Sequence, residues 1–123
     1  MPNPTALLQT DQITVWQNTE RNLRFAVQDA SYTVSNGIVT TTWNPYTLIN
    51  VTPLFYLKSA ATAADGSPVG FSTIYDVNNG IVNVNLQPAT IATPGTQWYR
   101  LDLVLADTNK VTVAAGPFVV KAA

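Results

Sequence analysis

Residues 94–120, PGTQWYRLDLVLADTNKVTVAAGPFVV, contain three runs that are typical of β-strands, separated by turn signals. Residues 98–106, 111–113 and 118–121 are rich in β-branched, aromatic and leucine side chains. DTNK lies between the first two runs, and Gly116-Pro117 precedes the third. This order predicts a hairpin, a break and a closing strand. No nucleophile and base stand together on these strands, so the sheet itself is the first candidate for the functional part of the molecule.

The rest of the chain continues the pattern. Apolar and polar residues alternate at residues 12–17 and most clearly at 23–29, where Leu23, Phe25 and Val27 are expected to face the core. Asn36-Gly37 stands between β-branched runs in residues 31–43 and predicts a tight hairpin. Further strands are expected at residues 54–59, 71–77 and 81–86, with Pro53 marking a strand start, a bulge or an edge, an exposed connection at 60–70, and a crossover at 89–96.

These segments give eight or nine short strands, with turn signals every 8–12 residues or so, which predicts an all-β sandwich or barrel. No segment has a clear helical period, and residues 60–64 could form one helical turn at most. The 123 residues fit a single domain. We find no internal repeat.

Charge is unusually scarce, because only 11% of the residues are charged and the net charge is -1. Soluble domains usually carry about a quarter of charged residues. This composition favours a chain held among protein partners, although a secreted or simply Thr- and Asn-rich β-domain would look similar. The six Lys and Arg form no cluster in the sequence, so nucleic acid is not an expected partner. No apolar run approaches the roughly 20 residues of a membrane span, so no membrane is expected either.

The chain contains no Cys and no His, which removes the standard catalytic triads and nearly all transition-metal sites. We therefore expect no catalytic residue, no cofactor and no metal site. The loops DTNK and DVNNG lack the density of acids that a dedicated calcium site needs. A carboxylate hydrolase would require Asp76 and Asp102 to converge across a cleft.

Aromatic residues leave a carbohydrate-binding module open as the alternative function. Exposed aromatic rings can stack on sugar rings, and a β-sandwich is a common scaffold for such sites. The candidates are Trp43, Tyr46, Tyr75 and Trp98. Large rings on strands also serve as core or interface residues.

The order of these segments resembles the N-terminal immunoglobulin-like domain of siphophage baseplate upper proteins. Residues 16–29, WQNTERNLRFAVQD, are similar to the family's short strand, turn and following strand, with Asn18-Thr19-Glu20 in place of its glycine turn. Residues 48–59, LINVTPLFYLKS, are similar to its next apolar strand apart from Pro53, and residues 79–120 are similar to its closing run. Residues 31–46 are an insertion relative to the family.

This resemblance implies an immunoglobulin-like β-sandwich over residues 11–123 with an extended N-terminal arm over residues 1–10. Tyr99, after Pro94-Gly95, would then be a tyrosine corner, a tyrosine whose hydroxyl bonds to upstream backbone. The arm residues Pro2, Pro4, Leu7 and Leu8 would lie on a neighbouring subunit, and the exposed face near Phe71 could also serve an interface.

The function implied is a non-enzymatic structural protein of a tailed-phage virion. Its partners would be other virion proteins, either of the tail and baseplate or the major capsid protein, with several copies in the assembly. Because no fibre segment follows the module in this sequence, a decoration or cement protein is expected as well as a fibre adaptor. Residues 1–10 lack the features of a signal peptide, so synthesis in the host cytoplasm and a location in the virion are expected.

Overall fold

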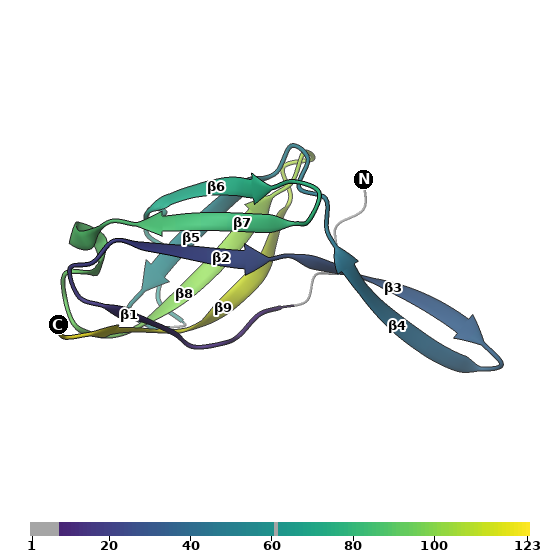
Figure 1. Cartoon of the computed structure of the whole chain (residues 1–123), viewed down its shortest axis with the longest axis horizontal. Coiled ribbons are helices and arrows are strands. Elements are labelled where there is room, and N and C mark those ends of the chain that lie inside the picture. Colours follow the sequence, from purple (N-terminus) through teal and green to yellow (C-terminus); the bar gives the residue numbers. More distant parts are fainter. Residues whose placement is uncertain (1–7, 61) are drawn as a thin grey trace.

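The computed structural model describes residues 8–60 and 62–123 and confirms the all-β prediction (Figure 1). The strands are β1 (Ile13–Trp16), β2 (Arg21–Ala26), β3 (Gln28–Ser35), β4 (Ile38–Pro45), β5 (Thr52–Lys58), β6 (Phe71–Asp76), β7 (Ile81–Leu86), β8 (Gly95–Val104) and β9 (Lys110–Lys121). A short 3-10 helix, Pro88–Ile91, lies in the predicted crossover between β7 and β8.

Two sheets form the body of the molecule, and they face each other as a β-sandwich. One sheet has the strand order β1-β9-β8-β5 and the other β2-β7-β6. The strands pair antiparallel, except that β1 runs parallel to β9. The third pair, β3-β4, extends away from the body as a separate two-stranded hairpin (Figure 1).

Alternating side chains build the core between the two sheets. In β7, Val82, Val84 and Leu86 are fully buried, and asparagines stand between them on the outer face. Four aromatic rings join the sheets, since Phe25 of β2 packs 6.1 Å from both Phe55 of β5 and Tyr99 of β8, and Phe55 packs 6.4 Å from Phe118 of β9 (ring centroids). Such aromatic contacts contribute beyond the area that they bury.

The predicted break at Gly116-Pro117 was wrong, because β9 is one continuous strand. Proline lacks an N–H and is tolerated where the ladder does not need one. The N–H of Ala115 donates to Gln9 on the side of β1, so the nitrogen of Pro117, two residues on, points to that side as well. Between the Gln9–Ala114 bridge and the Ile13–Phe118 pair, the N-terminal segment does not pair with β9. The ladder therefore needs no N–H from residue 117.

Proline is accommodated in β5 for a related reason. Pro53 is the second residue of the strand and pairs with Leu103 of β8, while β5 forms the edge of its sheet. The strand begins at Thr52, earlier than the predicted residue 54. Pro53 therefore lies on an edge strand, which is one of the positions predicted for it.

The N-terminal segment joins the body before the predicted boundary at residue 10. Gln9 bonds to the backbone of both Val113 and Ala115. The hydroxyl of Tyr99 donates to the carbonyl oxygen of Asp11 at 2.7 Å. This acceptor is 88 residues upstream, whereas a tyrosine corner bonds a few residues upstream, so Tyr99 ties the N-terminal segment to β8. Leu8 is half exposed, and Pro2, Pro4 and Leu7 lie outside the described residues.

Backbone contacts at one turn hold the root of the hairpin. Val27, directly before β3, donates its N–H to the carbonyl of Gly80, and Tyr46, directly after β4, donates to the carbonyl of Val27. Gly80 has a φ of 69°, and a Cβ there would lie 2.5 Å from the Val27 oxygen and 2.7 Å from the Tyr46 oxygen. The turn between β6 and β7 therefore requires glycine at this position.

Substituting Gly80 should destabilise the protein more than substituting Gly37 in the hairpin turn. Both have positive φ, but no atom lies within 4 Å of a Cβ placed on Gly37. We expect Gly37→Ala to cost about 1 kcal/mol from backbone strain alone, and Gly80→Ala to cost more than about 2 kcal/mol because backbone must also shift. Urea unfolding of both variants measures this difference, and equal losses would contradict the account of the hairpin root.

Candidate functional site

The hairpin formed by β3 and β4 is the most distinctive surface of the molecule. Each strand has eight residues, so the hairpin is about 26 Å long. Asn36 and Gly37 connect the strands, with φ values of 52° and 77°. Two consecutive positive values define a type I′ turn, which forms the tight hairpin that the Asn-Gly pair predicted. The tight turn fixes the register, which pairs Ser35 with Ile38 and continues without a shift to Gln28 and Pro45.

This register divides the hairpin into two unlike faces. Directly paired residues share a face, and the face alternates along each strand. One face, which we call the apolar face, carries the pairs Ala30–Trp43, Tyr32–Thr41 and Val34–Val39. The opposite face carries Asp29–Asn44, Ser31–Thr42, Thr33–Thr40 and Ser35–Ile38. On that polar face the Asn44 amide donates to the Ser31 hydroxyl at 3.1 Å.

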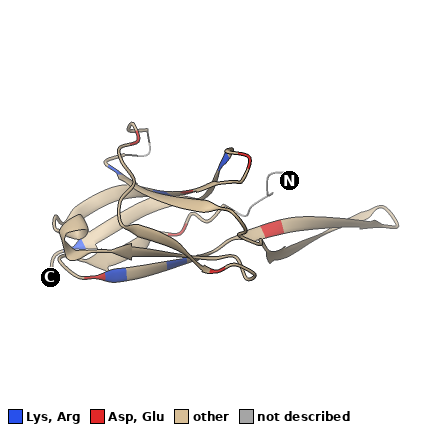
Figure 2. Cartoon of the chain, turned by 90° about the horizontal axis from the view of Figure 1, so that it is seen from above, with Lys and Arg blue, Asp and Glu red and all other residues tan. Residues whose placement is uncertain are grey.

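The apolar face is open to solvent. Val34 is 71% exposed, Val39 62% and Tyr32 59%. Ile38, on the opposite face beside the turn, is 68% exposed. No Lys, Arg, Asp or Glu occurs between Asp29 and Lys58. Figure 2 accordingly shows a charge only at the root of the hairpin. Large apolar side chains without neighbouring charges are typical of surfaces that bind another molecule.

A hairpin of this kind gains little stability from its own contacts. An isolated two-stranded hairpin is at best marginally stable in water, and its outer edges leave backbone N–H and C=O groups unpaired. The hairpin contributes none of its strand residues to the buried core. Another molecule could cover the apolar face and form hydrogen bonds with the open strand edges.

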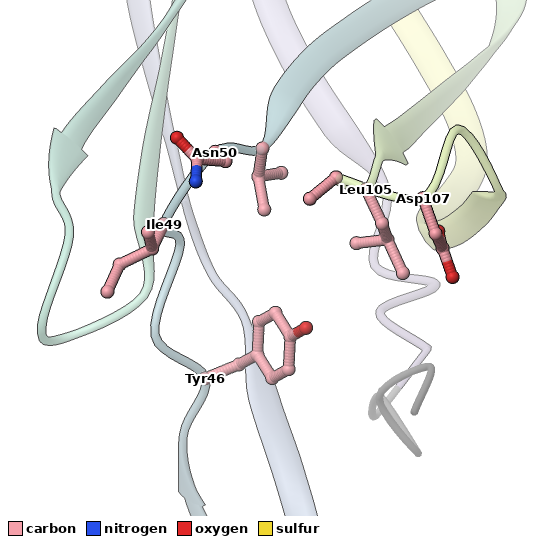
Figure 3. A pocket seen from close by; sticks show the side chains of 7 residues that line it. Tyr46, Ile49, Asn50, Leu105 and Asp107 are labelled. Atoms are coloured by element: carbon pink, nitrogen blue, oxygen red, sulfur yellow. The ribbon is translucent and has the colours of Figure 1, made fainter. Parts of the chain in front are cut away.

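A pocket of about 340 Å³ opens beside the root of the hairpin. We call it the end pocket, and its lining residues are Tyr46, Ile49, Asn50, Val51, Leu105, Ala106 and Asp107. Tyr46 directly follows β4, and Figure 3 shows its ring on one side of the pocket and Leu105 on the other. Ile49 at the pocket is 56% exposed. The size is at the lower end of the range for ligand pockets, and the lining is mostly apolar.

Tyr46 supplies a neutral polar group to this pocket. Burial, followed by the negative charges of Asp29 and Asp107, raises the pKa of the Tyr46 hydroxyl. The group therefore keeps its proton at neutral pH. The residues that line the pocket include no Lys or Arg and only one acid, Asp107, so they suit a largely apolar guest rather than a reaction.

An ionisable cluster lies on the outer face of the four-stranded sheet. Arg100 contacts Asp65 through both terminal nitrogens, one of them at 2.9 Å, and its Nε donates to Asp102 at 3.0 Å. Thr112 donates to the other oxygen of Asp102, which is 3% exposed. Lys58 also contacts Asp65. These contacts attach the connection between β5 and β6, which contains Asp65, to β8. The carboxylates of the cluster are paired with these side chains.

The Arg100–Asp65 contact should make stability depend on pH. Hydrogen bonds from Arg100 lower the pKa of Asp65 in the folded state. The unfolded value is about 3.9, so the contribution is present above about pH 4 and is lost as the pH falls through the lower folded pKa. Thermal unfolding should show Asp65→Asn less stable than the parent at pH 7, with the difference shrinking toward pH 2. A difference that stays constant would contradict this assignment.

The two carboxylates considered for a hydrolase do not form a pair. Asp102 lies on the outer face of the four-stranded sheet, because its neighbours Leu101 and Leu103 face the core. Asp76 ends β6 in the other sheet, where it accepts bonds from the backbone and side chain of Asn79. Among the described residues, no group of three or more Asp or Glu side chains could hold a metal ion.

The four aromatic residues considered for sugar binding do not share a surface. Tyr75 follows the core-packed Ile74 and so lies on the outer face of its sheet, where the Arg24 guanidinium is 3.7 Å from the ring centroid. Trp98 precedes buried Tyr99 and so lies on the outer face of the opposite sheet. Tyr46 lines the end pocket, and Trp43 belongs to the hairpin. One platform made of all four does not exist.

Sequence reasoning located the hairpin but did not predict that its apolar face is exposed. Tyr32, Val34 and Val39 alternate as the residues of a core-facing strand would, and no local signal distinguishes the two cases. The available signals were the absence of charge and the position of residues 31–46 as an insertion relative to the resembled family. In comparisons with known proteins, the chain matches no family model and no curated protein. The described part of the chain contains no helix long and apolar enough to cross a membrane.

Proposed function

We propose that this chain is a non-enzymatic structural protein of a tailed-phage virion, in which the β-sandwich is the body and the hairpin docks on another protein subunit. The observation that carries the proposal is the apolar, uncharged face of the hairpin, which projects away from the body and is not covered by the described residues. A two-stranded hairpin of this length becomes stable when a partner covers it. A structural role in an assembly supplies that cover permanently.

The strand arrangement supports an immunoglobulin-like body. When the seven body strands are lettered A to G in chain order, β2, β7 and β6 become B, E and D, and β9, β8 and β5 become G, F and C. Immunoglobulin constant-type domains have these BED and CFG neighbours. The first strand, β1, joins the G strand instead of the B strand. The hairpin is then an insertion between strands B and C.

The virion context rests on the sequence resemblance and on composition. Residues 16–29, 48–59 and 79–120 resemble the immunoglobulin-like domain of baseplate upper proteins, and a charged fraction of 11% suits a protein that stays among partners. Within a virion, the proposal covers two positions, a fibre adaptor on the tail and a decoration or cement protein on the capsid. Fold likeness alone does not separate these positions.

Charges on the apolar face should prevent incorporation into particles. Glutamates at positions 34 and 39 would have to be buried on docking, which costs several kcal/mol and should reduce incorporation at least about tenfold. The test mixes Val34→Glu/Val39→Glu protein with shells, and separately with tails, that lack this protein, and measures the bound fraction. The matched control is Thr33→Glu/Thr40→Glu, which adds the same charges to the neighbouring pair on the polar face.

Each outcome of this test is informative. Binding of the parent to shells places the protein on the capsid, and binding to tails places it on the baseplate or a fibre. Thermal unfolding must first show that both variants remain folded, which their exposed positions allow. If the parent binds neither particle, or if the apolar-face variant binds as well as the control, the proposed function is wrong.

A further inference from the structure

We propose that the outer face of the three-stranded sheet binds an acidic oligosaccharide, a chain of sugar units that carries carboxylate groups. This inference goes beyond the proposed function and does not involve the hairpin. The binding surface, which we call the amide face, consists of side chains on β2, β6 and β7 that point away from the core. They are Asn22, Arg24, Phe71, Thr73, Tyr75, Asn83 and Asn85.

Strand register arranges most of these side chains in two rows across the sheet. The rows are Phe71–Asn85–Asn22 and Thr73–Asn83–Arg24. Because neighbouring strands lie about 4.8 Å apart, each row is about 10 Å long. A ligand that contacts both edges of the face must therefore be longer than one sugar ring.

The centre of the amide face offers hydrogen bonds to hydroxyl groups. The amide nitrogens of Asn83 and Asn85 donate to the Oδ1 of Asn22 at 3.3 and 2.9 Å, which holds the three side chains together. The amide nitrogen of Asn22 donates to none of the described residues, and the Oδ1 of Asn83 is a buried acceptor without a partner among them. A hydroxyl group both accepts and donates. Sugar hydroxyls can therefore bond to this row when side chains adjust on binding, as they commonly do.

The Arg24 guanidinium provides the contact with a carboxylate. Arg24 and Tyr75 belong to the strands on either side of β7, and the guanidinium lies 3.7 Å from the centroid of the Tyr75 ring. This contact holds the guanidinium over the amide face. Arg24 forms no hydrogen bond or ion pair with the described residues, so its N–H groups remain available. A guanidinium can donate two parallel hydrogen bonds to one carboxylate, which makes this group well suited to an acidic sugar.

A polar groove of about 370 Å³ continues from the amide face toward the N-terminal segment. Asn22 and Arg24 line this groove, and so does Arg21, which forms no ion pair with any described residue. Asp11 is the one acid in the lining, so basic groups outnumber acidic groups here although the whole chain has a net charge of -1. This local charge favours a ligand with more than one carboxylate, of which one lies at Arg24 and another at Arg21.

Exposed aromatic rings favour a sugar chain over other anions. Phe71 is 65% exposed and Tyr75 is 56% exposed. The C–H groups on one side of a sugar ring form an apolar surface that packs on such rings, while its hydroxyls require polar partners like the amides. A peptide rich in acids has no hydroxyls for the amides. Nucleic acid also stacks on aromatic rings, but its charge at every nucleotide requires a more basic surface than two arginines.

The acids near the amide face do not compete for Arg24. Glu20, directly before β2, accepts a hydrogen bond from Gln87. Asp76, at the end of β6, accepts hydrogen bonds from Asn79. Neither carboxylate forms an ion pair with Arg24, so a bound carboxylate does not have to displace one.

Calorimetric titration of the full chain with hexagalacturonate, a chain of sugar acids, tests the charged contact. Its neutral methyl ester is the matched ligand, and we expect the acid to bind at least about fivefold more tightly. Arg24→Gln should weaken binding of the acid to the level of the ester and leave the ester unchanged, because the two charges form one contact. Lys110→Gln is the matched control, since it removes an exposed charge from the other sheet.

Two further comparisons separate sugar binding from attraction of charge alone. Phe71→Ala should weaken both the acid and the ester at least about fivefold, because both lose the same ring contact. Tyr32→Ala removes a similarly exposed ring from the hairpin and should change neither. Monomeric galacturonate should bind at least about tenfold more weakly than the hexamer, because it cannot reach from Phe71 to Arg24 across about 10 Å.

Four results would overturn the proposal. One is the absence of binding to both hexagalacturonate and a hyaluronan hexasaccharide at millimolar concentrations. Another is equal affinity for the acid and its ester. The third is unchanged binding of the acid by Arg24→Gln protein that thermal unfolding shows to be folded. The fourth is tighter binding of a glutamate hexapeptide or a thymidine hexanucleotide, which would mean that the surface recognises a different anion.

Discussion

The close approach of backbone at Gly80 is the constraint on which the distinctive surfaces of this protein depend. Val27 bonds to Gly80, and Tyr46 bonds to Val27, so both ends of the hairpin are held at the turn between β6 and β7. Any side chain at Gly80 would displace these contacts. The same contacts fix the backbone of Tyr46, whose ring forms one wall of the end pocket. The direction of the hairpin and the shape of the pocket are thus set by one glycine in the sandwich.

The parts of the fold that could be predicted from the sequence are those with local physical causes. Asn36-Gly37 specifies a type I′ turn because both residues accept positive φ, and the register of the hairpin follows from it. Leu23 and Phe25 alternate with polar residues because one face of β2 is buried, and the structure places both in the core. The strands expected at residues 71–77 and 81–86 left room between them for the turn that contains Gly80. An all-β fold of about nine strands was therefore accessible without coordinates.

Other features depend on contacts between distant segments. Proline at position 117 reads as a strand break, and only the pairing of Gln9 with β9 reveals that its missing N–H falls where the ladder is interrupted. Tyr99 was expected to bond to upstream backbone, and the sequence did not indicate that its acceptor is Asp11, 88 residues away. For the site, the alternation of Tyr32, Val34 and Val39 was visible, whereas its exposure was not. Local sequence patterns indicate that one face of a strand is apolar, but they do not indicate what covers that face.

The open edges of the hairpin affect how the free chain behaves in solution. Natural edge strands are often protected by lysine, by a bulge or by proline within the strand, and β3 and β4 pair without a register shift, carry no lysine, and have proline only at the final residue, Pro45. An unassembled copy therefore offers a regular strand edge and an apolar face that can template aggregation. If the hairpin docks as proposed, the free pool of the protein would have to stay small, and synthesis would have to keep pace with incorporation.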